Sequence, residues 1–95
     1  MNVAQEILEQ FGGNQSMSMI SGVAIMGEKH LTVKFHGCKK TNIVTIILDE
    51  AMDLYEMTFY RLCGVNLKEV EKIGQVYAED MREIFESKTG LYLSL

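Results

Sequence analysis

The fold is decided by residues 66–90, which read NLKEVEKIGQVYAEDMREIFESKTG. Apolar residues recur there at intervals of three and four, and this spacing places them on one side of an α-helix. They are Leu67, Val70, Ile73, Tyr77, Met81, Ile84 and Phe85, with Ala78 beside them. Charged residues fall mainly on the opposite side. The spacing therefore predicts one long amphipathic helix that packs against the rest of the chain.

Both ends of this predicted helix carry residues that commonly start or stop helices. Asn66 can accept hydrogen bonds from the free N–H groups of the first turn, and Glu69, three residues later, completes a capping box. Gly90 can adopt the left-handed conformation that ends many helices. Gly74 lies in the interior and costs about 1 kcal/mol relative to alanine, so a kink or a break there is left open.

The first two thirds of the chain predict a short helix followed by four strands. Residues 2–11 have an apolar side at helical spacing, and Gly12-Gly13 ends that helix. From Ser16 onward apolar and polar residues alternate, which is typical of half-buried strands. The predicted strands cover residues 16–25, 31–36, 42–48 and 54–62.

This order of elements predicts one α+β domain over residues 1–95. Short connections favour antiparallel neighbours, and each strand has one dominant apolar face. The expected fold is a short N-terminal helix, a four-stranded antiparallel sheet and a long C-terminal helix, with both helices on one sheet face. The other face of the sheet would carry Thr32, Lys34, His36, Ile43, Ile47, Glu56, Thr58 and Tyr60.

Composition and charge exclude several classes of protein. With 47% hydrophobic and 23% charged residues, the 95-residue chain is ordinary for a globular domain, so disorder is not expected. Apolar runs stay shorter than the ~18–20 residues of a membrane span, and the start does not read as a signal peptide. These features predict a cytoplasmic protein without membrane contact, in which Cys38 and Cys63 are free thiols. The net charge of −4 argues against nucleic acid as a partner.

Two stretches resemble small proteins encoded by bacteriophages and related mobile elements. Residues 4–14, AQEILEQFGGN, resemble their opening segment. Residues 77–85, YAEDMREIF, together with residues 89–95, TGLYLSL, resemble their closing segment. The resemblance covers only the two ends of the chain and includes no motif tied to a reaction. It implies an accessory gene of a phage or an integrated element, and it assigns no functional residue.

The candidate metal ligands are too few for a zinc site. A strand would place His36 and Cys38 on the same face, and Cys63 ends a neighbouring strand. Zinc usually takes four protein ligands, or three with one open position, and the one further imidazole is His30 at the other end of the same strand. No metal and no cofactor are therefore predicted.

The candidate catalytic groups do not form a recognisable reaction centre either. Asp49 with Glu50, or Glu56 with His36, could act as acid–base pairs, but their positions on strands and turns imply no cleft. The sequence contains no nucleophile elbow, P-loop or dinucleotide-binding fingerprint. The prediction is therefore a protein that is not an enzyme.

The predicted function is protein–protein contact, as an accessory protein of a phage or mobile element. The apolar tail, residues 91–95, is expected to be tied down, either on its own sheet or on a second copy or another partner. The predicted interaction residues are Leu91, Tyr92, Leu93 and Leu95 of the tail, with His36, Glu56 and Tyr60 of the sheet.

Two alternatives to this function are left open. In the first, the acidic side of the closing helix imitates a nucleic-acid backbone and inhibits a DNA-binding protein of the host. In the second, the exposed sheet face around His36, Glu56 and Tyr60 binds a small ligand or a substrate.

Overall fold

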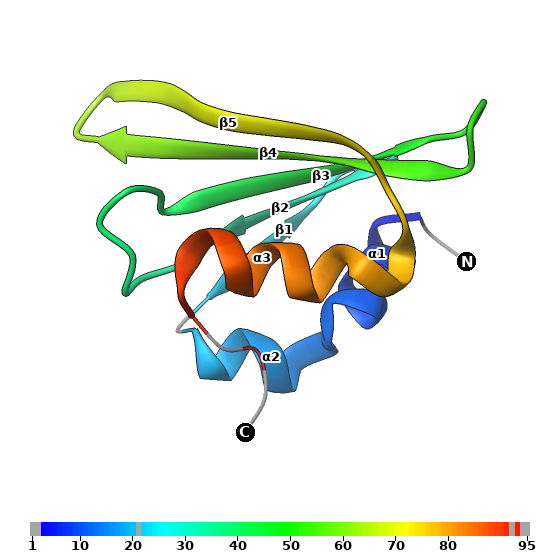
Figure 1. Cartoon of the computed structure of the whole chain (residues 1–95). Coiled ribbons are helices and arrows are strands. Elements are labelled where there is room, and N and C mark those ends of the chain that lie inside the picture. Colours follow the sequence, from blue (N-terminus) through cyan, green and yellow to red (C-terminus); the bar gives the residue numbers. More distant parts are fainter. Residues whose placement is uncertain (1–2, 21, 92, 94–95) are drawn as a thin grey trace.

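The computed structural model describes residues 3–20, 22–91 and 93 of the chain. In Figure 1 the strands form one layer and the helices lie on one side of it. The prediction of an α+β fold with an antiparallel sheet and a C-terminal helix is confirmed, but the sheet has five strands rather than four. The elements are α1 (Val3–Phe11), α2 (Gly13–Met19), β1 (Val23–Met26), β2 (His30–Lys34), β3 (Ile43–Asp49), β4 (Leu54–Cys63), β5 (Asn66–Val76), the 3-10 turn η1 (Ala78–Asp80) and α3 (Met81–Thr89).

The strands pair in chain order, and every neighbouring pair is antiparallel. One row across β2 to β5, which consists of Leu31, Ile46, Met57 and Ile73, faces the helices. None of the helices within the described ranges is long and apolar enough to cross a membrane.

The predicted long helix over residues 66–90 is wrong in its first half. Asn66–Val76 forms β5 against β4, and only Met81–Thr89 is helical. Asn66, which was expected to cap the helix, is instead the first residue after a two-residue hairpin turn, Gly64-Val65. Gly64 has a φ of 63°. That turn geometry suits the twist of antiparallel strands, so it directs the chain back along β4. Gly90 does end α3 in the left-handed conformation, with a φ of 75°.

Two β-bulges explain why the apolar spacing of β5 imitates a helix. Glu69 and Glu71 pair with consecutive residues of β4, which leaves Val70 as an extra residue. In the same way, two residues between Ile73 and Val76 face a single residue of β4. A bulge adds one residue to a strand, so an interval of three returns to the same face. Ile73 and Val76 accordingly both pack against the core.

The predicted first strand, residues 16–25, is also wrong over most of its length. Residues 13–19 form α2, and only Val23–Met26 is a strand. Gly12 does not simply end the first helix, because it lies at a tight corner with a φ of 119°. A Cβ atom at Gly12 would lie 1.7 Å from Ser16 Oγ, so this corner requires glycine. Ser16 and Met17 then lie on the buried side of α2, and Ile20, directly after the helix, is buried as well.

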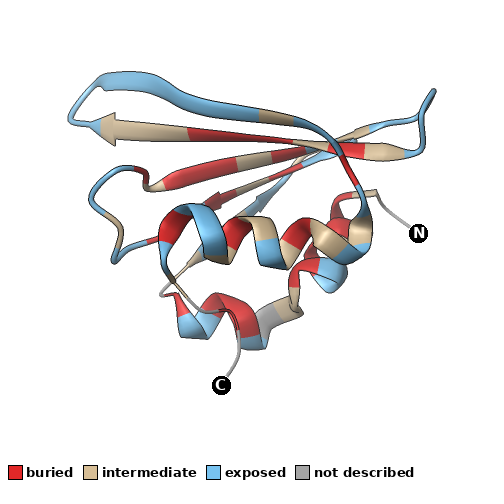
Figure 2. Ribbon diagram, viewed as in Figure 1, coloured by how far each residue is buried: buried red, intermediate tan, exposed pale blue. Residues whose placement is uncertain are grey.

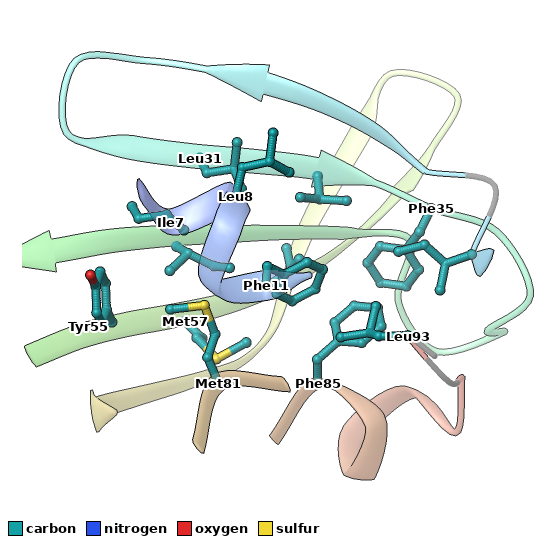
Figure 3. Packing of buried hydrophobic residues seen from close by; sticks show 14 of the residues in the cluster. Ile7, Leu8, Phe11, Leu31, Phe35, Tyr55, Met57, Met81, Phe85 and Leu93 are labelled. Atoms are coloured by element: carbon teal, nitrogen blue, oxygen red, sulfur yellow. The ribbon is translucent and has the colours of Figure 1, made fainter. Parts of the chain in front are cut away.

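The core lies between the sheet and the helices, and Phe85 of α3 is at its centre (Figure 3). The Phe85 ring packs edge-on against Phe11 and Phe35, each with centroids 5.0 Å apart. It stacks on Phe59 of β4 at 6.3 Å. These contacts join the first helix, the end of β2, the middle of β4 and the last helix into one apolar cluster.

The part of the tail that the structure describes packs on its own chain. Leu93 is fully buried in the core cluster, and Leu91 is half-buried against it. The Leu93 N–H donates to Glu86 Oε2 at 2.8 Å, and its carbonyl accepts from Ser16 Oγ at 2.9 Å. Of the two alternatives for the tail, Leu91 and Leu93 therefore follow the first, because they pack on their own chain. Tyr92 and Leu95 lie outside the described residues.

Candidate interaction surface

The sheet face that points away from the helices is not covered by any described helix, and it is called the open face here. Figure 2 shows that buried residues gather on the helices and on the central strands, while β5 is exposed along most of its length. The strand register assigns to the open face Val23, Ile25, His30, Thr32, Lys34, Ile43, Thr45, Ile47, Glu56, Thr58, Tyr60, Leu67, Glu69 and Lys72.

The middle of the open face is polar and its groups are paired with one another. The hydroxyls of Thr32 and Thr45 lie 3.3 Å apart across β2 and β3. Glu56 Oε1 and Lys72 Nζ form an ion pair at 3.4 Å across β4 and β5. Thr58, which lies opposite Lys72, is buried although no helix covers it. The polar groups in this part of the surface therefore already have partners within the sheet, and few of them are free to bind a ligand.

The three residues predicted for this face do not converge on one point. Glu56 and Tyr60 are four residues apart on the same strand, a separation of about 13 Å. His36 lies beyond the end of β2, where its backbone N–H donates to the carbonyl of Ile20 at 3.2 Å. Tyr60 is half-buried in the row that also holds Ile43 and Lys34. Among the described residues, none of these three lines any of the three concave regions described below.

Exposed apolar side chains gather at the β1 edge of the sheet. Val23 is 61% exposed, Ile25 47% and Met26 46%. These three residues are called the β1 margin here. Ile47, two strands further in on the open face, is 40% exposed. Val23 and Ile25 lie on the open face, as Ile47 does, whereas Met26 lies on the helix side of the same edge. Because exposed apolar side chains of this kind often mark contact sites, this edge is a candidate contact site for another protein.

The opposite edge of the sheet is protected against such contacts. Within β5 the charged residues are Lys68, Glu69, Glu71 and Lys72. The two bulges also interrupt the regular row of backbone hydrogen-bonding groups along this strand. Charges and bulges are common devices against edge-to-edge pairing. In β1, by contrast, four uncharged residues pair one-to-one with β2.

Two adjoining grooves lie between β5 and α3. The larger encloses about 380 Å³ and includes Ile73 and Ile84 in its lining, and the smaller encloses about 240 Å³ beside Val70. The ion pair between Lys88 Nζ and Glu71 Oε2, 2.8 Å long, belongs to both linings. Among the described residues, neither lining contains histidine or cysteine, and both include Ser87.

A third concave region beside Tyr55 is lined by Glu6, Glu9, Gln10, Asp53 and Ala78 as well. Burial raises the pKa of Tyr55 above its ordinary value of 10.0, and the charges of Glu6 and Asp53 raise it further. A hydrogen bond with Gln10 acts in the opposite direction. The tyrosine therefore stays a neutral hydrogen-bonding group rather than a base.

Cys38 and Cys63 are separate free thiols, the first half-buried and the second exposed. Partial burial acts to raise the pKa of Cys38, but backbone hydrogen bonds from Thr41 and Lys40 and the Thr41 hydroxyl outweigh it and lower the pKa below 9.0. In the described ranges, no three side chains of histidine, cysteine, aspartate or glutamate come together as metal ligands. Every buried side-chain nitrogen or oxygen of those ranges also has a hydrogen-bond partner.

The chain matches no known family, no curated protein and no solved structure. Its candidate surface therefore rests on the geometry alone. The alternation of residues 42–48 predicts Ile47 on the open face, and the strand register confirms this. The alternation of residues 16–25 predicts one long strand, so it does not reveal the β1 margin. The exposed apolar residues of a four-residue edge strand cannot be told from core residues before the neighbouring helix is known.

Proposed function

We propose that this chain acts by binding another protein chain through the open face beside β1, as an accessory protein of a phage or mobile element. The single observation that carries the proposal is the contrast between the two sheet edges. One edge carries charges and bulges, whereas the other exposes the β1 margin. Ile47 is exposed on the open face two strands further in. The resemblance of both chain ends to small phage-encoded proteins supports the genetic setting.

The open face supports contact better than catalysis. Its paired threonines and its Glu56–Lys72 ion pair are already satisfied within the sheet. His36, Glu56 and Tyr60 lie along different parts of the surface. No observation favours the nucleic-acid mimic, because the acidic residues of the expected helix are divided among β5, η1 and α3, and Glu71 is paired with Lys88.

The test compares how well two variants, Ile47→Glu and Val65→Glu, bind proteins from a bacterial host. Val65 is 96% exposed at the tip of the β4–β5 hairpin, so it controls for added charge away from the proposed surface. Immobilised wild-type protein and Val65→Glu should retain the same host protein, and Ile47→Glu should not. With the retained protein purified, we expect its dissociation constant to rise by about tenfold or more for Ile47→Glu alone. Equal affinity for all three forms would refute this use of the open face.

A further inference from the structure

We infer that two copies of this chain pair through their β1 strands, antiparallel about a two-fold axis, so that the two sheets become one. This inference rests on the proposed function, because it names the partner of the β1 margin as a second copy. β1 lies at the end of the sheet with β2 as its one neighbouring strand among the described residues. Its regular, uncharged edge is open to strand addition.

The backbone groups available at this edge follow from the β1–β2 hairpin. The Gly27 N–H donates to the carbonyl of His30 at 2.9 Å, which makes these two residues a hydrogen-bonded pair. Hydrogen-bonded and non-hydrogen-bonded pairs alternate along antiparallel strands. Ile25 is therefore bonded to β2 through its backbone, while the peptide groups of Ala24 and Met26 point away from it. These groups are the donors and acceptors of the free edge.

One register uses these groups fully. Gly22 cannot donate to a second copy, because its N–H already donates to the carbonyl of Met17 at 2.8 Å. The favoured register therefore places Ala24 of each copy opposite Met26 of the other. Each such pair exchanges both of its N–H···O bonds. The two-fold axis then passes between Ile25 of one copy and Ile25 of the other.

The side chains of β1 suit pairing with themselves. On the open face, Ile25 would contact Ile25 of the second copy, and on the helix side, Met26 would cover Ala24 of that copy. A two-fold axis brings residues near it against their own copies, so a charge at such a position would be repelled by itself. The β1 strand contains no charge. Because the strand is short, the interface is small and we expect a weak dimer with a dissociation constant in the micromolar range or above.

Disulfide cross-linking tests the register. In a background with Cys38→Ser and Cys63→Ser, Ile25→Cys would place two Cα atoms about 4.5 Å apart across the axis, within disulfide range. Val23→Cys is the matched control, because its two copies would be about 13 Å apart along the strands. Mild oxidation should give a covalent dimer of Ile25→Cys that increases with protein concentration. Equal yields from the two variants, or none from Ile25→Cys, would overturn the register.

Sedimentation equilibrium tests the contact without cross-linking. From about 10 μM to about 1 mM, the mass of the wild-type protein should rise toward that of a dimer. Ile25→Lys should remain a monomer with an unchanged circular dichroism spectrum. The control Leu67→Lys, which adds a lysine at the β5 edge, should associate like the wild type. A wild-type monomer throughout would overturn self-pairing. If Ile47→Glu still abolished binding of a host protein in that case, the proposed function would stand.

Discussion

At the scale of single residues, Phe85 has the widest role in packing. It contacts aromatic rings from α1, from the end of β2 and from β4, and all four rings are buried. Loss of this side chain would leave a cavity bordered by three elements that are held in place by other contacts. The cavity could not close fully, because its walls belong to both layers of the fold.

Phe85→Ala should therefore lower the free energy of unfolding by about 3–5 kcal/mol. Tyr77→Ala is the control, since Tyr77 is an exposed aromatic residue a short distance before α3, and its loss should change stability by about 0.5 kcal/mol or less. Urea denaturation followed by circular dichroism measures both. Similar losses for the two variants would show that Phe85 does not have the central role described.

A second residue-scale prediction concerns Cys38. Because hydrogen bonds lower its pKa below 9.0, its thiolate should react with iodoacetamide at a lower pH than an ordinary thiol. In a Cys63→Ser background, Thr41→Val removes the hydroxyl that donates to the sulfur at 3.8 Å. The midpoint of the alkylation rate against pH should then move upward.

Thr41→Ser keeps this hydroxyl and should leave the midpoint unchanged. The same hydrogen bonds affect stability, because they favour the thiolate of Cys38 in the folded state. Their contribution to the free energy of unfolding is present above the pKa of Cys38 in the unfolded chain. It is lost as the pH falls through the pKa of Cys38 in the folded chain. A midpoint that is the same in Thr41→Val and Thr41→Ser would contradict the assigned role of the hydroxyl.

At the scale of elements, the strands in which buried and exposed residues alternate without interruption could be predicted from the sequence. β3 and β4 were predicted almost to their ends, because Val44 and Ile46, like Met57 and Phe59, fall on one buried face without interruption. β5 could not be predicted from apolar spacing, because its two bulges turn the strand period of two into intervals of three. Bulge positions depend on pairing with β4, which local sequence does not encode.

The error over residues 16–25 had a different cause. Alternating serine and methionine imitates a strand, yet methionine is a good helix former, and the corner at Gly12 begins a new helix. The candidate surface was predicted only in part for the same reason. Ile47 follows from the simple alternation of β3, whereas the exposure of Val23 and Met26 depends on where α2 ends.

The bulge of β5 near its end gives an element-scale prediction. Gln75 has a φ of 55°, a conformation that favours glycine, and it lies between Ile73 and Val76, where two residues face one. Gln75→Gly should raise the free energy of unfolding by about 0.5–1 kcal/mol, because the strain is relieved. Asp53→Gly, at the same φ, should gain less, since aspartate tolerates this region better.

Gln75→Val should lower stability, because a β-branched side chain is strongly disfavoured at positive φ. Thermal unfolding of the three variants ranks them directly. If Gln75→Val were as stable as the wild type, residue 75 would not have the left-handed backbone conformation.

At the scale of the whole molecule, the two layers do not match in width. Buried residues line the helix side of β2, β3 and β4, whereas β5 has only Val76 buried and Ile73 half-buried and is exposed along most of its length (Figure 2). This strand is held mainly by its ladder with β4, by the Glu56–Lys72 ion pair across the two strands and by the Lys88–Glu71 ion pair with α3. Stability should therefore be uneven across the sheet.

Amide hydrogen exchange should reveal this gradient. The amides of β3, a central strand with Val44 and Ile46 fully buried, should exchange only through global unfolding. Those of Asn66–Glu71 should exchange at least about 100-fold faster through local opening. Mass spectrometry of peptides from the two strands provides the comparison, with Lys88→Ala expected to accelerate exchange in β5 alone. Uniform protection of β3 and β5 would contradict the uneven stability.

The helix-like spacing of β5 has a consequence for how the chain folds. Helical turns form in less than a microsecond, whereas hairpins need several microseconds. Residues 66–76 are thus expected to visit helical conformations before β4 is available as a partner, with the hydrophobic side of that transient helix continuing into α3. The native hairpin must then replace it. Residues 66–76 are a point of local frustration, where the preference of the segment and the demand of the finished sheet disagree.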